Sequence, residues 1–250
     1  MRIENSFIPV RGVGEQTERE LWRSGVTHWD DFDGSVVGPT TADRIEAFID
    51  EARGRLREGD TRFFGEAFPS QERWRLYENF REQTCFFDIE TTGLSKERDR
   101  VTTVSFHRGD ETTTLVQGDD LTAETIREQF EDAALMATFN GARFDVPFLE
   151  TSFDLALDLP HIDLMYPCKR IGLDGGLKTI EQDVGIAREG PDISGRDAVR
   201  LWNEYERGSQ EALDTLVEYN RDDTRNLKTL MDIVADSLHA DVFEAERGST

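Results

Sequence analysis

Apolar residues recur at strand spacing in the middle of this 250-residue chain and at helical spacing on both sides of it. Residues 85–89 form an almost continuous apolar run, and Arg108-Gly109-Asp110 separates two β-rich segments, as in a hairpin. The predicted elements, in chain order, are strands at 85–91, 101–106 and 112–116, a helix at 121–134, a strand at 135–139, a helix from Asp145, a strand at 162–164, loops and short helices from Tyr166 to Asp197, and a helix at about 209–238. This order predicts an α/β fold with a mixed sheet flanked by helices.

Two shorter helical patterns precede the sheet region. The first follows Gly12 and Gly14, and the second starts at Gly38. Charged residues come next, and Ser70 is suited to cap a helix that leads to the first strand. The predicted divisions are a small all-α domain at 1–52, a linker and entry helix at 53–82, the α/β domain at 83–240 and a flexible tail at 241–250.

Two acidic residues stand inside or directly after the first apolar run. Side chains of a strand alternate between its faces, so Asp88 and Glu90 point to one side while Phe87 and Ile89 point to the other. Neighbouring carboxylates repel each other and are costly to bury, and a divalent cation that prefers oxygen ligands offsets that cost. The alternative is a solvated edge strand whose acids point to water.

Two later segments supply partners for these strand acids. A strand ends near Asn140 and a helix begins at Asp145. In the last predicted helix, Tyr219 and Asp223 are four residues apart and share one face. Asp222 lies roughly 100° around that helix and is the weaker candidate.

The three segments, taken in this order, resemble the motifs of the DEDD exonucleases. Asp88-Ile89-Glu90 comes first, Asn140 to Asp145 second, and Tyr219 to Asp223 third, and a tyrosine in the third motif is typical of one branch. The chain most resembles the YprB-type stand-alone group of that branch over roughly residues 60–240, also through Trp74-Arg75-Leu76 and His161-Ile162-Asp163-Leu164. The resemblance implies an RNase H-like fold and a 3′–5′ exonuclease that hydrolyses single-stranded DNA or RNA by a two-metal mechanism.

The resemblance also implies roles for individual residues. It assigns two divalent cations, Mg²⁺ or Mn²⁺, to the carboxylates of Asp88, Glu90, Asp145 and Asp223. It assigns the orientation of the attacking water to Tyr219, and it implies that Asp163 braces a neighbouring loop. The residues expected to meet substrate are Thr91, Thr92, Gly93, Leu94 and Asn140.

The N-terminal glycines resemble those of a helix-hairpin-helix pair. Glycine lets backbone N–H groups point outward at a helix N-terminus, which suits a phosphate. Gly12, Gly14 and Gly38 are therefore candidate phosphate-binding residues, although the second helical segment has one glycine where two are typical. The alternative is that these glycines only form tight turns in a small helical domain.

Acidic residues outnumber basic ones along the chain, with 52 Asp and Glu against 29 Lys and Arg and a formal net charge of −23. Such a charge repels a polyanion in dilute salt, but the Debye length falls to about 3 Å near 1 M. We therefore interpret the surface as halophilic, since regular apolar periodicity argues against disorder. Lys169, Arg170 and Lys178 give local positive charge that either borders a nucleic-acid path or is incidental in a solvated loop.

Other features limit the class of protein. No apolar run reaches the roughly 18 residues of a membrane span, and the N-terminus lacks an apolar signal core, so we expect a cytoplasmic protein without a membrane partner. Cys85 and Cys168 show no paired metal spacing.

Three functional hypotheses remain from the sequence. The first is the nuclease, and the second is a non-catalytic nucleic-acid-binding module. The third is a proofreading or processing subunit that is active only in a larger repair complex with a helicase, polymerase or other repair protein. The nuclease is favoured because a binding module does not need five correctly spaced site residues.

Overall fold

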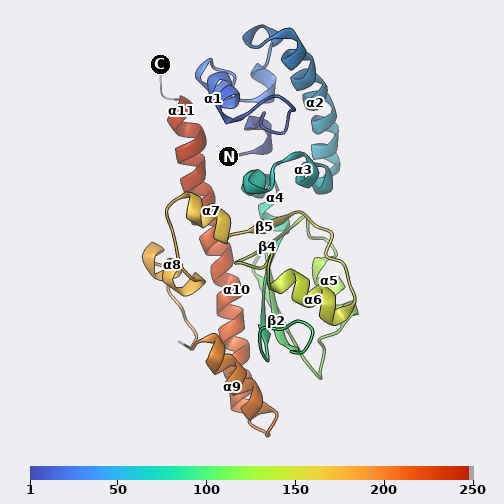
Figure 1. Cartoon of the computed structure of the whole chain (residues 1–250), viewed down its shortest axis with the longest axis vertical. Helices are drawn as coiled ribbons and strands as arrows, with labels where there is room; N and C mark the ends of the chain where they lie inside the picture. Colours follow the sequence, from blue (N-terminus) through green and yellow to red (C-terminus); the bar gives the residue numbers. More distant parts are fainter. Residues whose placement is uncertain (192, 248–250) are drawn as a thin grey trace. The chain divides into compact units, whose positions relative to one another are not determined.

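A five-stranded mixed sheet is the centre of the fold in the computed structural model, which describes residues 1–191 and 193–247 (Figure 1). The strands, in spatial order, are β3 (Glu111–Val116), β2 (Val101–Arg108), β1 (Thr84–Thr91), β4 (Leu135–Thr138) and β5 (His161–Asp163). β1, β2 and β3 pair antiparallel, whereas β4 pairs parallel with both β1 and β5. This arrangement confirms the predicted α/β class and its mixed sheet.

The chain divides into two compact units. We call Met1–Arg81 together with Ile233–Thr250 the N-terminal unit, and Glu82–Asp232 the sheet unit. The division falls within α10 (Gln210–His239). No helix in the described part of the chain combines the length and apolarity that a bilayer crossing requires.

The β2–β3 hairpin forms at the predicted turn. Arg108 pairs with Glu111, and Gly109 between them has a φ of +60°, a left-handed conformation that favours glycine. The register between β1 and β2 shifts between Glu90 and Thr91, so the strand becomes irregular directly after its two acids.

Opposite faces of β1 meet different surroundings. Phe87 and Ile89 belong to an apolar cluster with α5 (Ala123–Phe130) and α6 (Asp145–Phe153), in which the rings of Phe87 and Phe130 are 5.4 Å apart. Figure 1 shows α5 and α6 on one side of the sheet and α10 on the other. The alternation predicted for this strand is therefore confirmed, and its acids face the α10 side.

In the described part of the chain, three helices follow β5 in the sequence before α10, and the sequence pattern did not predict one of them. α7 (Met165–Arg170) and α8 (Leu177–Val184) match the predicted short helices. α9 (Gly195–Tyr205) was not predicted, although Ser194 and Asp197 form a capping box at its start. It is stabilised by tertiary packing, because Leu201 and Trp202 lie in a cluster with the first turns of α10.

The N-terminal unit is helical, as expected, but its boundaries differ from the prediction. Its elements are η1 (Ile3–Asn5), α1 (Glu15–Arg23), η2 (Trp29–Asp31), η3 (Gly34–Val36), α2 (Pro39–Glu58), α3 (Thr61–Ala67), η4 (Ser70–Leu76), α4 (Tyr77–Phe80), and, after α10, η6 (Ala240–Glu244) and α11 (Ala245–Arg247); η5 (Arg81–Gln83) spans the junction with the sheet unit. The expected boundary after residue 52 lies inside α2. That helix continues to Gly59, whose φ of +70° ends it, because the intervening residues are mostly good helix formers.

The predicted flexible tail is also corrected where it is described. Residues 241–247 are helical, and residues 248–250 lie outside the described part. The Phe243 ring packs edge-on against Trp22 at 5.2 Å, and Glu246 forms ion pairs with Arg19 and Arg23. Burial of Phe243 against Trp22 of α1 therefore stabilises the helical structure of residues 241–247, although most of these residues are polar.

Candidate active site

Three carboxylates from two elements meet beside the sheet. Asp88 and Glu90 extend from the end of β1 and Asp223 from the middle of α10, and one oxygen of each lies within 4.8 Å of the others. The strand spacing brings the first two to one face, and the packing of α10 on that face adds the third. Oxygen ligands in such a group suit a hard divalent cation.

Asp145 adds a fourth acid next to this group. It is the first residue of α6 and is buried, and its Oδ1 accepts a hydrogen bond from the Ile89 backbone N–H at 3.3 Å. That bond holds Asp145 beside β1 at the position between Asp88 and Glu90. The structure therefore brings together all four acids that the sequence singled out.

The electrostatics of the group favour a bound cation. Burial, followed by repulsion from the neighbouring acids, raises the pKa of Glu90 to about 8 and that of Asp88 well above its usual range. Burial also raises the pKa of Asp145 to about 7. Because like charges at short range oppose ionisation, a divalent cation would stabilise the ionised carboxylates, and these residues fit one.

Tyr219 lies one helical turn before Asp223 and is also buried. Burial and the nearby Asp223 and Glu90 carboxylates raise the pKa of the Tyr219 phenol above its ordinary value. The hydroxyl therefore keeps its proton and serves as a hydrogen-bond donor beside the carboxylates.

Asn220 lies in the third motif, but the residue pattern alone indicates no role for it. Its Nδ2 donates to Asp88 Oδ2 at 2.7 Å and to the Asp88 carbonyl at 3.2 Å, while its Oδ1 accepts from the Thr103 hydroxyl at 3.0 Å. A fully buried amide with three partners fixes the orientation of the Asp88 carboxylate. Its place next to Tyr219 was the only signal available in the sequence.

Comparison with known proteins agrees with this fold. The family model of the RNase_H superfamily matches residues 85–235, which include the sheet and all of these site residues. The chain belongs to the RNase H superfamily. Among curated protein sequences, none matches the chain.

Two solved structures have distant similarity to this RNase H superfamily member. NrnC of Brucella melitensis with bound Mg²⁺ has 21% identity and a TM-score of 0.49, with 68% of this chain and 81% of that chain covered. The family B DNA polymerase of the hyperthermophilic archaeon Pyrobaculum calidifontis has 16% identity and a TM-score of 0.47. That match covers 66% of this chain and 27% of the polymerase chain.

A basic side chain that the residue pattern did not indicate contacts Asp223 of the candidate site. Arg188, in the segment between α8 and α9, forms ion pairs with Asp223 and with buried Glu181, both at 2.6 Å. Its guanidinium carbon is 5.8 Å from the centre of the Tyr219 ring, and Lys178 Nζ is 5.5 Å from the same centre. Arg188 opposes the effect of burial on Asp223, whose pKa rises only to about 6. Only the folding of this segment onto α10 reveals the contact.

The turn after β1 holds the predicted substrate residues in a defined conformation. The Thr91 hydroxyl donates to the Gly93 carbonyl at 2.6 Å, and Thr92 bonds to the Arg100 backbone. A Cβ at Gly93 would lie 2.5 Å from an Asp99 carboxylate oxygen, so a side chain there would displace Asp99. Leu94 is 88% exposed and points outward.

The turn before α6 is braced from β5. Asp163 accepts hydrogen bonds from the backbone N–H groups of Asn140 at 2.7 Å and Ala142 at 3.1 Å, which confirms its predicted bracing role. Asn140 is exposed with a φ of +63°, a left-handed conformation that asparagine tolerates. Asp222, the weaker candidate, accepts from the Gly190 N–H and does not belong to the group of three carboxylates.

The predicted phosphate-binding glycines lie apart from this site in the sequence, in the N-terminal unit. Gly14 and Gly38 immediately precede α1 and α2, as expected. Gly12 has a φ of +99°, and a Cβ there would lie 3.3 Å from an Arg44 guanidinium nitrogen. Their binding of phosphate stays a prediction.

Proposed function

We propose that this protein is a metal-dependent 3′–5′ exonuclease that hydrolyses phosphodiester bonds of single-stranded DNA or RNA, of the DEDD type with tyrosine in the third motif. The observation that carries the proposal is the meeting of Asp88, Glu90 and Asp223 within 4.8 Å, with Asp145 beside them. Membership of the RNase H superfamily supports the same conclusion.

The acidic group is costly for the fold, which supports a functional purpose. Four carboxylates with raised pKa values, of which Asp145 and Asp223 are buried and Asp88 and Glu90 half-buried, weaken the folded state at neutral pH. Apolar residues of similar size would pack in their place without that repulsion. Two divalent cations, Mg²⁺ or Mn²⁺, supply Lewis-acid stabilisation of the attacking and leaving oxygens when they are bound. Asp88, Glu90, Asp145 and Asp223 are the residues that would hold them.

The neighbouring residues position these acids and the reactants. Asn220 fixes Asp88, and the Ile89 N–H fixes Asp145. Tyr219 keeps its proton and orients the attacking water through its hydroxyl. Arg188 pairs with Asp223 and is close enough to this group to pair with a phosphate oxygen of the substrate.

The turn after β1 is suited to the terminal nucleotide. Its backbone is held by the bonds of Thr91 and Thr92, while the exposed Leu94 side chain offers an apolar surface for a base. Asn140, exposed at the end of β4, offers polar groups on a turn that Asp163 keeps rigid. We assign recognition of the strand end to these residues.

A direct test uses single-stranded DNA and RNA labelled at either the 5′ or the 3′ end, with Mg²⁺ or Mn²⁺ in molar KCl. A 3′–5′ exonuclease releases single labelled nucleotides from 3′-labelled strands at once and shortens 5′-labelled strands stepwise. Asp88→Asn should abolish both patterns. Asp132→Asn, which removes an exposed acid after α5, is the matched control and should cleave like the parent.

The result separates this proposal from the two alternatives. Strand binding without any cleavage at any metal concentration would indicate a non-catalytic module. Cleavage that appears only after a cell extract or a purified polymerase or helicase is added would indicate a subunit of a larger complex. Equal cleavage by the parent and Asp88→Asn would contradict the assignment of the site.

A further inference from the structure

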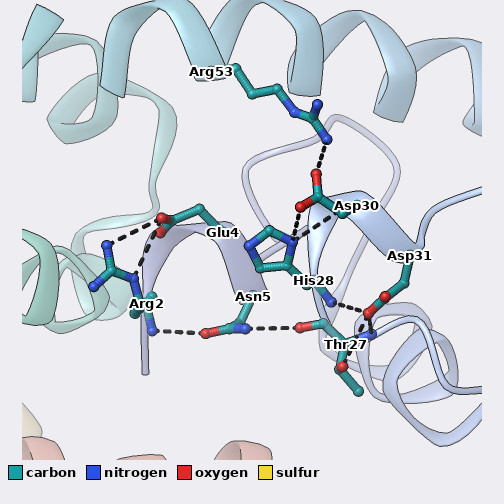
Figure 2. Close-up of polar contacts among 8 residues, drawn as sticks. All are labelled: Arg2, Glu4, Asn5, Thr27, His28, Asp30, Asp31 and Arg53. Atoms are coloured by element: carbon teal, nitrogen blue, oxygen red, sulfur yellow. Dashed lines mark hydrogen bonds and ion pairs between the residues drawn. The ribbon is translucent and has the colours of Figure 1, made fainter. Parts of the chain in front are cut away.

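A cleft with an unusual share of arginine lies in the N-terminal unit. It has a volume of about 580 Å³ and lies among η1, η2 and the last turns of α2. Its polar lining consists of Arg2, Arg53, Arg57, His28, Glu4 and Asp30. Figure 2 shows the side chain of Arg53 extending from its helix toward Asp30 and His28, and Arg2 beside Glu4.

Both carboxylates of the cleft are already engaged. Glu4 pairs with Arg2 at 3.2 Å, and Asp30 pairs with Arg53. His28 Nδ1 accepts a hydrogen bond from the Asp30 backbone N–H at 3.0 Å, so the ring proton of the neutral imidazole is on Nε2, which is a donor.

Arg57 supplies the excess positive charge. Its Nε donates to the Arg53 carbonyl at 3.2 Å, and among the described residues no carboxylate pairs with it. Three guanidinium groups thus face two carboxylates. Each guanidinium carries five N–H donors, so most donors around the cleft remain available to an anion.

Arg55, which lies between Arg53 and Arg57 in α2, forms ordinary ion pairs with nearby carboxylates. Arg55 lies on another face of α2 from Arg53 and Arg57 and pairs with both Glu51 at 3.4 Å and Asp60 at 3.0 Å. Arginine near a helix C-terminus also interacts favourably with the helix dipole, and Arg55 satisfies that role. The dipole likewise favours Arg57 in the same last turn, but it does not account for Arg53, which lies a turn earlier and lines the same cleft.

The local charge balance also departs from that of the chain. Acids exceed basic residues by 23 overall, yet residues 53–81 hold seven arginines and five acids. In a chain with a net charge of −23, a cleft with excess guanidinium attracts an anion locally.

We propose that this cleft binds a phosphate group through Arg53 and Arg57, with Arg2 and His28 at its edge. The choice of a nucleic-acid strand as the source of that phosphate rests on the proposed function, since such a strand is the substrate of the carboxylate site. A free nucleotide carries the same chemistry, and the experiment distinguishes the two.

The test measures binding to the full chain with Asp88→Asn and a chelator present, so that no strand is cleaved. A fluorescein-labelled 20-nucleotide oligothymidylate is titrated by anisotropy over a series of KCl concentrations in which the protein stays folded. We compare two double variants. The cleft pair is Arg53→Gln/Arg57→Gln, and the control pair is Arg127→Gln/Arg207→Gln, which removes two exposed arginines of the sheet unit. We expect the cleft pair to weaken binding roughly tenfold and the control pair to leave it unchanged.

Salt dependence gives a second readout. Each lost phosphate contact reduces the slope of log K against log [KCl] by about 0.7 for a single strand, so two contacts reduce it by about 1.4. Titration with inorganic phosphate should also shift the His28 ring signals in NMR spectra of the parent, and not those of the cleft pair. His28→Gln assigns those signals.

Competition identifies the source of the phosphate. If ATP binding is lost in the cleft pair while oligothymidylate binding is unaffected, the site binds phosphate as proposed and its ligand is a free nucleotide. If the cleft pair and the control pair behave alike toward oligothymidylate, ATP and inorganic phosphate, the proposal is wrong. Failure of strand cleavage by the parent protein would count against the proposed function and leave this binding result intact.

Discussion

Arg188 is the residue whose contact most changes the picture of the acidic site. Its guanidinium lies 2.6 Å from Asp223 and 2.6 Å from Glu181 and is largely shielded from solvent. It therefore neutralises a carboxylate that we assign to cation binding. A guanidinium and a divalent cation compete for the same oxygens, so Arg188 should lower the affinity of the site for metal.

Arg188→Gln should consequently bind Mn²⁺ more tightly than the parent at pH 8.5, by roughly fivefold, which corresponds to about 1 kcal/mol for a partly shielded pair. Calorimetric titration measures this, with Arg127→Gln as the control. If Arg188 also contacts substrate phosphate, cleavage by the variant falls although metal binding improves. Weaker metal binding in Arg188→Gln would show that Arg188 shapes the site instead of competing for it.

Tyr219 can be separated from the acids by its hydroxyl. Tyr219→Phe keeps the ring and removes the group that orients water, so the cleavage rate should fall by about a hundredfold or more. Mn²⁺ affinity, measured by calorimetry, should barely change because the phenol is not a proposed ligand. A parallel collapse of metal affinity would show that Tyr219 supports the scaffold and that the tyrosine-branch assignment is wrong.

The raised pKa values predict how stability depends on pH without metal. The pKa of Glu90 rises from 4.5 to about 8, so between these values the folded chain binds more protons than the unfolded chain. The free energy of unfolding therefore decreases as pH rises through this window. Thermal melting in chelator should show a falling Tm from about pH 5 to pH 8, and Glu90→Gln should flatten that fall.

Two comparisons make this prediction specific. Addition of Mg²⁺ at pH 8 should restore the Tm of the parent, because the cation stabilises the ionised carboxylates. Asp132→Asn should retain the parental pH dependence. A Tm that is constant from pH 5 to pH 8 in chelator would contradict the raised pKa values.

At the scale of elements, a buried ion network joins two helices of the N-terminal unit. Arg75 of η4 is 1% exposed and pairs with Glu18 of α1 at 2.9 Å and with Glu72 at 2.7 Å. Glu18 also accepts hydrogen bonds from the Phe7 and Ile8 N–H groups at 2.7 and 2.9 Å. Since burial raises the pKa of Glu18 and Arg75 opposes that effect, the arginine is what allows this carboxylate to lie inside the unit.

Removal of one partner should therefore be costly. Arg75→Met should reduce the free energy of unfolding by about 3–5 kcal/mol, because the Glu18 carboxylate is left buried without its arginine partner. Denaturant titration monitored by tryptophan fluorescence measures this change, with Arg127→Gln as the exposed control. The combined change Arg75→Met/Glu18→Gln should recover part of the loss, and the absence of any recovery would contradict the charge argument.

At the scale of the whole chain, net charge governs the response to salt. A formal charge of −23 produces self-repulsion that favours the unfolded state at low ionic strength. Molar salt screens this repulsion, so the Tm should rise steeply between about 0.1 M and above 1 M KCl. Cleavage should also be greatest at high salt, although counterion release weakens strand binding there. Highest activity near 0.05 M KCl with an unchanged Tm would contradict the halophilic interpretation.

Local pattern in the sequence was sufficient for the sheet and for pairs of site residues. The alternation in 84–91 places Asp88 and Glu90 on one face because side-chain direction in a strand depends only on residue spacing. A spacing of four likewise puts Tyr219 and Asp223 together on a helix. The glycine at position 109 was sufficient to predict the hairpin, because the left-handed φ that the turn requires is a local property that glycine favours.

Tertiary structure alone decided which of these pairs meet and what surrounds them. Asn220 reaches Asp88 across 132 residues of sequence, and Arg188 reaches Asp223 only because its segment folds onto α10. The helical structure of residues 241–247 likewise depends on the burial of Phe243 against Trp22. Such contacts join remote segments, and their free energy comes from burial and charge pairing that no local spacing records. The sequence therefore determined the faces of the elements, and packing determined the site that those faces form together.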